Sequence, residues 1–190
     1  GTKGVFDPTV GTVKSMMAST PQLDRNAAYE GAKAFMGVDA WSLSDKTLSI
    51  PHAETQFDLG GVIKEFAVDQ AVMIAETFGV SSALVNFGGD IRALGTKPDG
   101  SPFNVAVLNP KNKHEPFFSL PLADAALTTS AHYERSFQFG DEESSHILSQ
   151  RGTHPQVLSV SVLAPTTLEA GVLSTACLLY TSPSPRDNTT

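Results

Sequence analysis

Apolar residues recur at helical spacing in the stretch between Asp58 and Gly79. We expect one helix from about residue 59 to 78 that ends at Gly79. Its buried stripe is predicted to consist of Ile63, Phe66, Ala67, Ala71, Ile74 and Phe78. Lys64 falls in the first turn, where the helix macrodipole disfavours a cation unless an anion binds there. Glycines just before this turn would let such an anion approach the backbone. The alternative is a surface lysine beside an ordinary glycine turn.

Shorter patterns predict the remaining elements. Helices are expected at 24–36, ending at Gly37, and at 167–179, capped by Thr166 or Thr167. Residues 6–11 favour a turn that starts a short helix. A hairpin is expected at 41–50, and strands at 83–87, 91–94, 103–108, 117–122, 125–129, 137–139, 146–148 and 157–163. This mixed order predicts the α+β class: an antiparallel or mixed sheet with helices packed on it.

Composition narrows the classes of protein to which the chain could belong. With 190 residues, 41% of them hydrophobic and 17% charged, it can form one domain with a sizeable core. A net charge of −7 without a Lys/Arg cluster argues against nucleic-acid binding. The single cysteine, Cys177, excludes an internal disulfide framework. No run is apolar and long enough to span a membrane. The sequence lacks both a signal peptide and an initial Met, so we expect a fragment whose N-terminal part is missing.

Three further polar clusters follow predicted strands. In residues 88–90, two glycines permit close approach of a ligand to an aspartate, although a tight turn is the simpler reading. Residues 128–135 combine hydroxyls with Arg135, whose planar fork suits phosphate; a polar loop with an Arg–Glu pair is the alternative. His146 could act as a general base near neutral pH or be structural. The other histidines show no metal-ligand spacing.

Six segments, in this order, resemble the FAD:protein FMN transferase family, also called ApbE. They are FDPTVG at 6–11, DLGGVIKEFAVD at 58–69, GGD at 88–90, TTSAHYER at 128–135, SHIL at 145–148 and EAGVLSTA at 169–176. The resemblance covers residue 6 to about 178, so we expect one flavin transferase domain over 1–178. The polar, Pro/Ser-rich residues 179–190 resemble a non-native tail that does not continue the last helix.

The resemblance implies a fold and a reaction. Such proteins have a T-shaped α+β fold with FAD in a cleft. With magnesium, they move the FMN half of FAD onto a Thr or Ser hydroxyl of a partner flavoprotein and release AMP. Some members hydrolyse FAD to FMN and AMP instead. They usually work in the periplasm or cell envelope, so any membrane contact of this protein would come from a missing N-terminal lipid anchor.

The resemblance also implies roles for individual residues. His146 matches the base that deprotonates the acceptor hydroxyl. The metal ligands would be the Thr175 hydroxyl and the backbone carbonyl of Ile63. The positions that would contact FAD are Asp58, Gly60, Gly61, Lys64, Gly88, Gly89, Asp90, Thr129, Ser130 and Arg135.

The chain departs from the family pattern at several positions. Many relatives read GGIAKGYAVD, and Glu65 stands at the second-half glycine of that motif. Ala131 replaces a glycine, and residues 149–153 replace Asp-Pro-Arg-Thr-Gly. Gly171 stands where the family has a metal-ligand aspartate, and magnesium prefers carboxylate oxygen. We therefore expect weak magnesium dependence, which a Gly171→Asp substitution would strengthen.

Two other functions stay open. One is a non-catalytic flavin-binding protein that has lost the metal site. The other is an FAD pyrophosphatase that uses no protein acceptor. A second carboxylate near Thr175 would favour catalysis, and Glu169 and Asp124 are the candidates.

Overall fold

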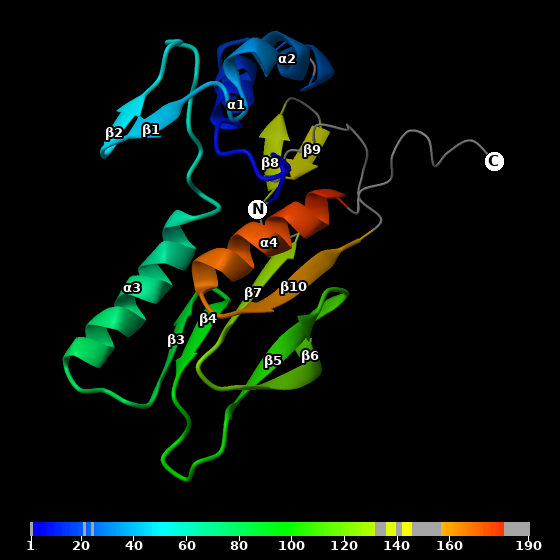
Figure 1. Ribbon diagram of the computed structural model, residues 1–190. Helices are drawn as coiled ribbons and strands as arrows, with labels where there is room; N and C mark the ends of the chain where they lie inside the picture. Colours follow the sequence, from blue (N-terminus) through cyan, green and yellow to red (C-terminus); the bar gives the residue numbers. More distant parts are fainter. Residues whose placement is uncertain are drawn as a thin grey trace. The chain divides into compact units, whose positions relative to one another are not determined.

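The computed structural model describes residues 2–20, 22–23, 25–131, 136–139, 142–145 and 157–180 (Figure 1). The chain forms two compact units. The first comprises residues 1–59, 132–156 and 179–190, and the second comprises 60–131 and 157–178. The candidate site residues are divided between the two units.

Helices form the core of the first unit. These are α1 (Gly11–Ser19), α2 (Arg25–Ala32) and the short 3-10 helix η1 (Lys33–Phe35). Their buried residues are Val13, Met17, Ala28, Tyr29 and Ala32. The helix expected at 24–36 is thus confirmed with a 3-10 last turn, and it stops before Gly37, which has a φ of 91°. Such a positive φ suits glycine.

Two hairpins complete the described part of the first unit. β1 (Ser42–Ser44) and β2 (Thr47–Ser49) pair antiparallel, which confirms the hairpin expected at 41–50. Asp45 and Lys46 form its turn with positive φ angles. β8 (Ser136–Phe139), which confirms the strand expected at 137–139, pairs with β9 (Glu142–Ser145), which the sequence pattern did not predict.

The second unit is built on an antiparallel sheet. Its strand order is β10 (Ser159–Ala164), β7 (Ala126–Ala131), β4 (Asp90–Leu94) and β3 (Ala83–Phe87). A separate hairpin joins β5 (Phe103–Asn109) to β6 (Asn112–Leu122). The helices α3 (Ile63–Thr77) and α4 (Thr167–Tyr180) accompany the sheet (Figure 1). Helices packed on antiparallel strands confirm the α+β class.

Side chains alternate between the two faces of the sheet, so that one face is apolar and the other is polar. On the apolar face, apolar residues of the sheet pack against the β5–β6 hairpin: Ile91, Ala93, Val105, Val107, Leu122 and Leu127. Side chains alternate along a strand, so the residues next to these point to the helices. Arg92 bonds to α3 and Ser130 bonds to α4 on that face. The side chains of Arg92 and Ser130 therefore lie between the sheet and its helices.

The buried face of α3 differs from the predicted stripe. The buried residues are Glu65, Val68, Asp69 and Val72, whereas Ile63, Phe66, Ile74 and Phe78 are exposed. The expected stripe was wrong because Asp69, on the opposite face, bonds to Arg92 of the sheet and to Thr167 and Leu168 of α4. The helix also begins later than expected, since residues 60–62 form a turn.

Other boundaries differ by smaller amounts. β6 begins at Asn112 rather than 117, and α4 continues to Tyr180, beyond the limit expected at 178 or 179. The strand expected at 146–148 lies outside the described residues. Over the described part of the chain, no helix has both the length and the apolar character needed to cross a membrane.

Candidate active site

Lys64 meets the β3–β4 turn at the start of α3. Its Nζ lies 2.7 Å from Asp90 Oδ2 in an ion pair. Asp90 is buried, while the lysine side chain keeps 34% of its surface exposed. A Cβ added at Gly88 would come within 3.9 Å of the same Nζ. The structure thus brings Lys64 together with Gly88 and Asp90, which belong to a separately predicted cluster.

The turn between β3 and β4 depends on its glycines. Gly88 and Gly89 have φ angles of 60° and 98°, and the hairpin closes with Phe87 opposite Asp90. Two positive φ angles are typical of a tight two-residue hairpin turn. Gly89 N–H donates to Asn86 Oδ1 at 2.9 Å. The tight turn foreseen as the simpler reading is therefore present, and it also presents Asp90 to Lys64.

Glu65 is the least expected member of the site. It is only 6% exposed, and among the residues that the structure describes its Oε2 has no hydrogen-bond partner. Burial raises the pKa of the Glu65 carboxyl above its ordinary value of 4.5, and the charge of Asp90 raises it further. The backbone hydrogen bond at Glu65 and the Lys64 ammonium act in the opposite direction. An acid side chain in this position needs a counter-charge or a proton.

Gly171 of α4 faces Glu65 directly. A Cβ built at Gly171 would lie 2.6 Å from Glu65 Cγ and 3.2 Å from its Oε1. An aspartate at 171 would therefore displace the Glu65 side chain, which fills that space, so the effect expected of Gly171→Asp stays a prediction. The two candidate carboxylates fail: Glu169 is exposed, and Asp124 accepts the Gly95 N–H at 2.6 Å in an exposed turn.

Hydroxyl groups link β7 to α4. Ser130 Oγ lies 2.7 Å from Ser174 Oγ and 3.0 Å from Thr175 Oγ1. Thr129 instead bonds to Ser161 of β10 at 2.7 Å. Because neighbouring residues of a strand point to opposite faces, Thr129 and Ser130 are separated. The structure therefore brings Ser130 and Thr175 together and leaves Thr129 on the other face.

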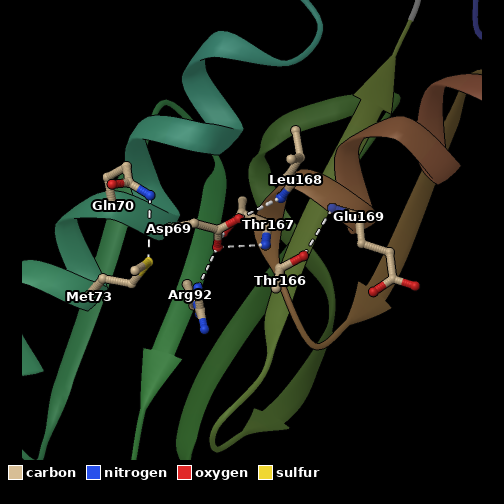
Figure 2. Close-up of polar contacts among 8 residues, drawn as sticks. All are labelled: Asp69, Gln70, Met73, Arg92, Thr166, Thr167, Leu168 and Glu169. Atoms are coloured by element: carbon tan, nitrogen blue, oxygen red, sulfur yellow. Dashed lines mark hydrogen bonds and ion pairs between the residues drawn. The ribbon is translucent and has the colours of Figure 1, made fainter. Parts of the chain in front are cut away.

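Asp69 fixes α4 to α3 and to the sheet, as Figure 2 shows. Its Oδ1 accepts from Arg92 Nη1 at 2.7 Å and from Thr167 N–H at 2.9 Å, while Oδ2 accepts from Leu168 N–H at 2.9 Å. Burial would raise the pKa of Asp69, but these bonds outweigh it and hold the pKa below the ordinary 3.8. Thr166 Oγ1 adds a bond to Glu169 N–H at 3.2 Å, which confirms it as a cap.

The other predicted site residues lie elsewhere. Asp58 belongs to the first unit, where its carboxylate pairs with Lys14 and its N–H donates to Pro8 O. Gly60 and Gly61 form the turn before α3, and Ile63 is the first residue of that helix. Arg135 and His146 lie outside the described residues.

Sequence reasoning named Thr128 within the cluster 128–135 and Glu65 as a departure from the family motif, but it assigned a site role to neither. A usable signal existed for Glu65, since the chain gains a carboxylate at 65 and lacks one at 171. Within the described ranges, no group of three or more His, Cys, Asp or Glu residues could hold a metal by itself. The arrangement can still neutralise an anion at Lys64 and offer hard oxygen ligands beside it.

Comparison with characterised sequences and structures identifies relatives. The sequence model of the ApbE family matches residues 1–184. The chain is 32% identical to the FAD:protein FMN transferase of Treponema pallidum over 70% of this chain and 40% of that protein. It is 28% identical to the enzyme of the same name from Haemophilus influenzae, over 92% of this chain and 54% of that protein. The chain thus spans about half the length of the curated relatives it matches.

Solved structures give the same result. The crystal structure of the ApbE protein from Thermotoga maritima superimposes with a TM-score of 0.83 at 28% identity, over 98% of this chain and 63% of that one. The flavin transferase ApbE from Vibrio cholerae gives a TM-score of 0.75 at 25% identity, over 94% and 59%. The architecture expected from the resemblance is confirmed, and the chain belongs to the ApbE family.

Proposed function

We propose that the protein transfers the FMN half of FAD to a Thr or Ser hydroxyl of a partner flavoprotein and releases AMP. Family membership supports this proposal, and the ion pair between Lys64 and Asp90 carries it on the structural side. A partly exposed ammonium, held at a glycine turn beside a helix N-terminus, suits a pyrophosphate. Val62, the N-cap of α3, makes no side-chain capping bond, so its side chain does not occupy the first-turn N–H groups that could bind such an anion.

The proposed reaction is a phosphoryl transfer. The acceptor oxygen bonds to the phosphorus of the FMN half, and the bond from that phosphorus to the bridging oxygen breaks. The bridging oxygen leaves with AMP, and His146 takes the hydroxyl proton. Lys64 would hold the pyrophosphate and offset charge on its oxygens as the bond breaks. The glycine turn 88–89 would let the nucleotide approach the backbone near Asp90.

Magnesium fits the residues present. The buried carboxylates of Glu65 and Asp90 offer hard oxygen; among the described residues Glu65 Oε2 has no hydrogen-bond partner, while Asp90 Oδ2 is paired with the Lys64 ammonium. Bound Mg²⁺ would neutralise phosphate charge during transfer. The family's usual setting suggests the periplasm or cell envelope for this protein too.

The proposal is tested by incubating the chain with FAD, Mg²⁺ and a candidate acceptor flavoprotein. Mass spectrometry of the acceptor should show one added FMN moiety, with AMP released in equal amount. An acceptor whose target Thr is replaced by Val is the matched control and should stay unmodified. Release of FMN and AMP without acceptor modification would identify an FAD hydrolase instead. FAD that stays intact while bound would identify a non-catalytic flavin-binding protein.

A further inference from the structure

Two buried side-chain oxygens in the described residues, Glu65 Oε2 and Thr128 Oγ1, have neither a hydrogen bond nor an ion pair, and a third, Asp90 Oδ2, accepts no hydrogen bond but lies 2.7 Å from the Lys64 ammonium. All three belong to the second unit, and their residues are 6%, 2% and 2% exposed. A buried polar group without a partner costs about 1–3 kcal/mol. Two such atoms, Glu65 Oε2 and Thr128 Oγ1, in one unit with the buried Asp90 carboxylate point to a ligand that this part of the fold is built to receive.

Strand register and charge bring these residues to one place. β4 pairs with β7 through Ile91–Leu127 and Arg92–Ala126, so Asp90 lies opposite Thr128 in the same register. Opposite side chains of an antiparallel pair have Cβ atoms about 4.5–5.5 Å apart. Glu65 reaches Asp90 from α3, since the Asp90 carboxylate is near enough to act on the Glu65 carboxyl. The carboxyls of Glu65 and Asp90 and the hydroxyl of Thr128 therefore face the space between the sheet and α3.

Gly171 makes room for the Glu65 carboxyl on the side of α4. Any side chain at 171 would begin with a Cβ 2.6 Å from Glu65 Cγ and 3.1 Å from its Cδ. Real Cβ atoms do not approach so closely, because packed interiors exclude such overlaps. Glycine in the middle of a helix also costs about 1 kcal/mol relative to alanine. This destabilising glycine lies at the position where Glu65 packs against α4.

The charge and chemistry of the cluster define the class of ligand. Two carboxylates and one ammonium leave a net negative charge when all are ionised, and Lys64 pairs with Asp90 rather than with Glu65. Of the two carboxylates, Glu65 is therefore the one without an ion pair in the described part of the chain, and its Oε2 accepts no hydrogen bond there. Carboxylate and hydroxyl oxygens select hard cations such as Mg²⁺ over soft ones.

We propose that Glu65, extending over Gly171, supplies the carboxylate oxygen of a divalent-cation site that also includes Asp90. The protein's carboxylate for Mg²⁺ therefore comes from α3 in this chain and not from α4. Water or phosphate oxygens complete the ligand shell, as is usual for Mg²⁺. The inference rests on the proposed function only in the choice of Mg²⁺, because the site itself follows from the contacts among these residues.

Metal binding without flavin tests the site. Electron paramagnetic resonance of free Mn²⁺ measures binding to the 190-residue chain, and added Mg²⁺ should displace the bound Mn²⁺. Glu65→Gln keeps the side-chain size and should weaken Mn²⁺ binding at least tenfold. Glu76→Gln, at an exposed position of the same helix, is the matched control and should bind as the parent does. A parent that takes up no Mn²⁺, or a Glu65→Gln variant that binds it equally well, would overturn the proposal.

Variants that exchange the residues at positions 65 and 171 test the site independently. Gly171→Asp alone should lower the melting temperature and weaken Mn²⁺ binding, because its Cβ collides with Glu65. Glu65→Gly alone should lose binding. Glu65→Gly combined with Gly171→Asp relieves the collision and should restore Mn²⁺ affinity to within about threefold of the parent. A double variant that binds no better than Glu65→Gly would refute the site. Intact Mn²⁺ binding with no FMN transfer would refute the proposed function alone.

Discussion

Arg92 donates from Nη1 to Asp69 Oδ1 at 2.7 Å, and through this carboxylate the sheet holds the start of α4. Asp69 belongs to α3, Arg92 to β4, and the capped N–H groups of Thr167 and Leu168 to α4 (Figure 2). One carboxylate therefore fixes the three elements that carry Glu65, Asp90 and Gly171. The geometry of the candidate site depends on it.

Replacing Asp69 by alanine should lower the free energy of unfolding by about 3 kcal/mol, since it removes a helix cap and leaves a largely buried arginine unpaired. Urea denaturation measures the change. Glu76→Ala, on the exposed side of the same helix, is the control and should stay within about 0.5 kcal/mol of the parent. Equal losses in both variants would show that the network does not stabilise the fold.

The same residue predicts a pH dependence of stability. The pKa of Asp69 is lowered in the folded protein, so its stabilising contribution is complete above the unfolded pKa near 3.8. That contribution is lost as the pH falls through the still lower folded pKa. The parent and Asp69→Asn should therefore differ in unfolding free energy by a constant amount between about pH 5 and pH 7. This difference should shrink below about pH 4. A difference that stays constant to the lowest pH would contradict the lowered pKa.

Local signals in the sequence were sufficient for most elements. Gly37 and Gly79 end helices with positive φ, and the polar pair Asp45-Lys46 makes the turn of the first hairpin. Such signals act over a few residues, so they hold in any tertiary context. The strand at 83–87 was likewise predicted with its observed bounds.

Tertiary partners decided what the sequence pattern could not. The spacing of Ile63, Phe66 and Ile74 predicted the wrong buried face of α3, because Arg92 and α4 supply partners that bury Asp69. The role of Gly171 depends on Glu65, which lies more than a hundred positions earlier in the chain. Periodicity within one segment contains no information about such a contact. The role of Gly171 could therefore be recognised only in the folded structure.

His146 is predicted to act on the acceptor and not on FAD. His146→Ala should reduce FMN transfer at least 100-fold, the usual contribution of a general base, while the dissociation constant of FAD stays within a few-fold. Transfer is followed by mass spectrometry of the acceptor and binding by flavin fluorescence. His114→Ala, on the exposed part of β6, is the control and should behave as the parent. Unchanged transfer in His146→Ala would remove it from the site.

Lys64 is predicted to recognise the pyrophosphate that distinguishes FAD from riboflavin. Lys64→Ala should weaken FAD binding about tenfold, or roughly 1.4 kcal/mol, and riboflavin binding less than twofold. The contrast between ligands matters because the substitution also leaves buried Asp90 without its ion pair. A disturbed turn at Gly88 would weaken the binding of both ligands alike, whereas a lost phosphate contact weakens only the binding of FAD.

Isothermal titration with FAD and riboflavin measures this difference. Lys111→Ala, at an exposed position beside the β5–β6 turn, controls for the overall loss of positive charge. Equal losses for FAD and riboflavin would place Lys64 away from the phosphates.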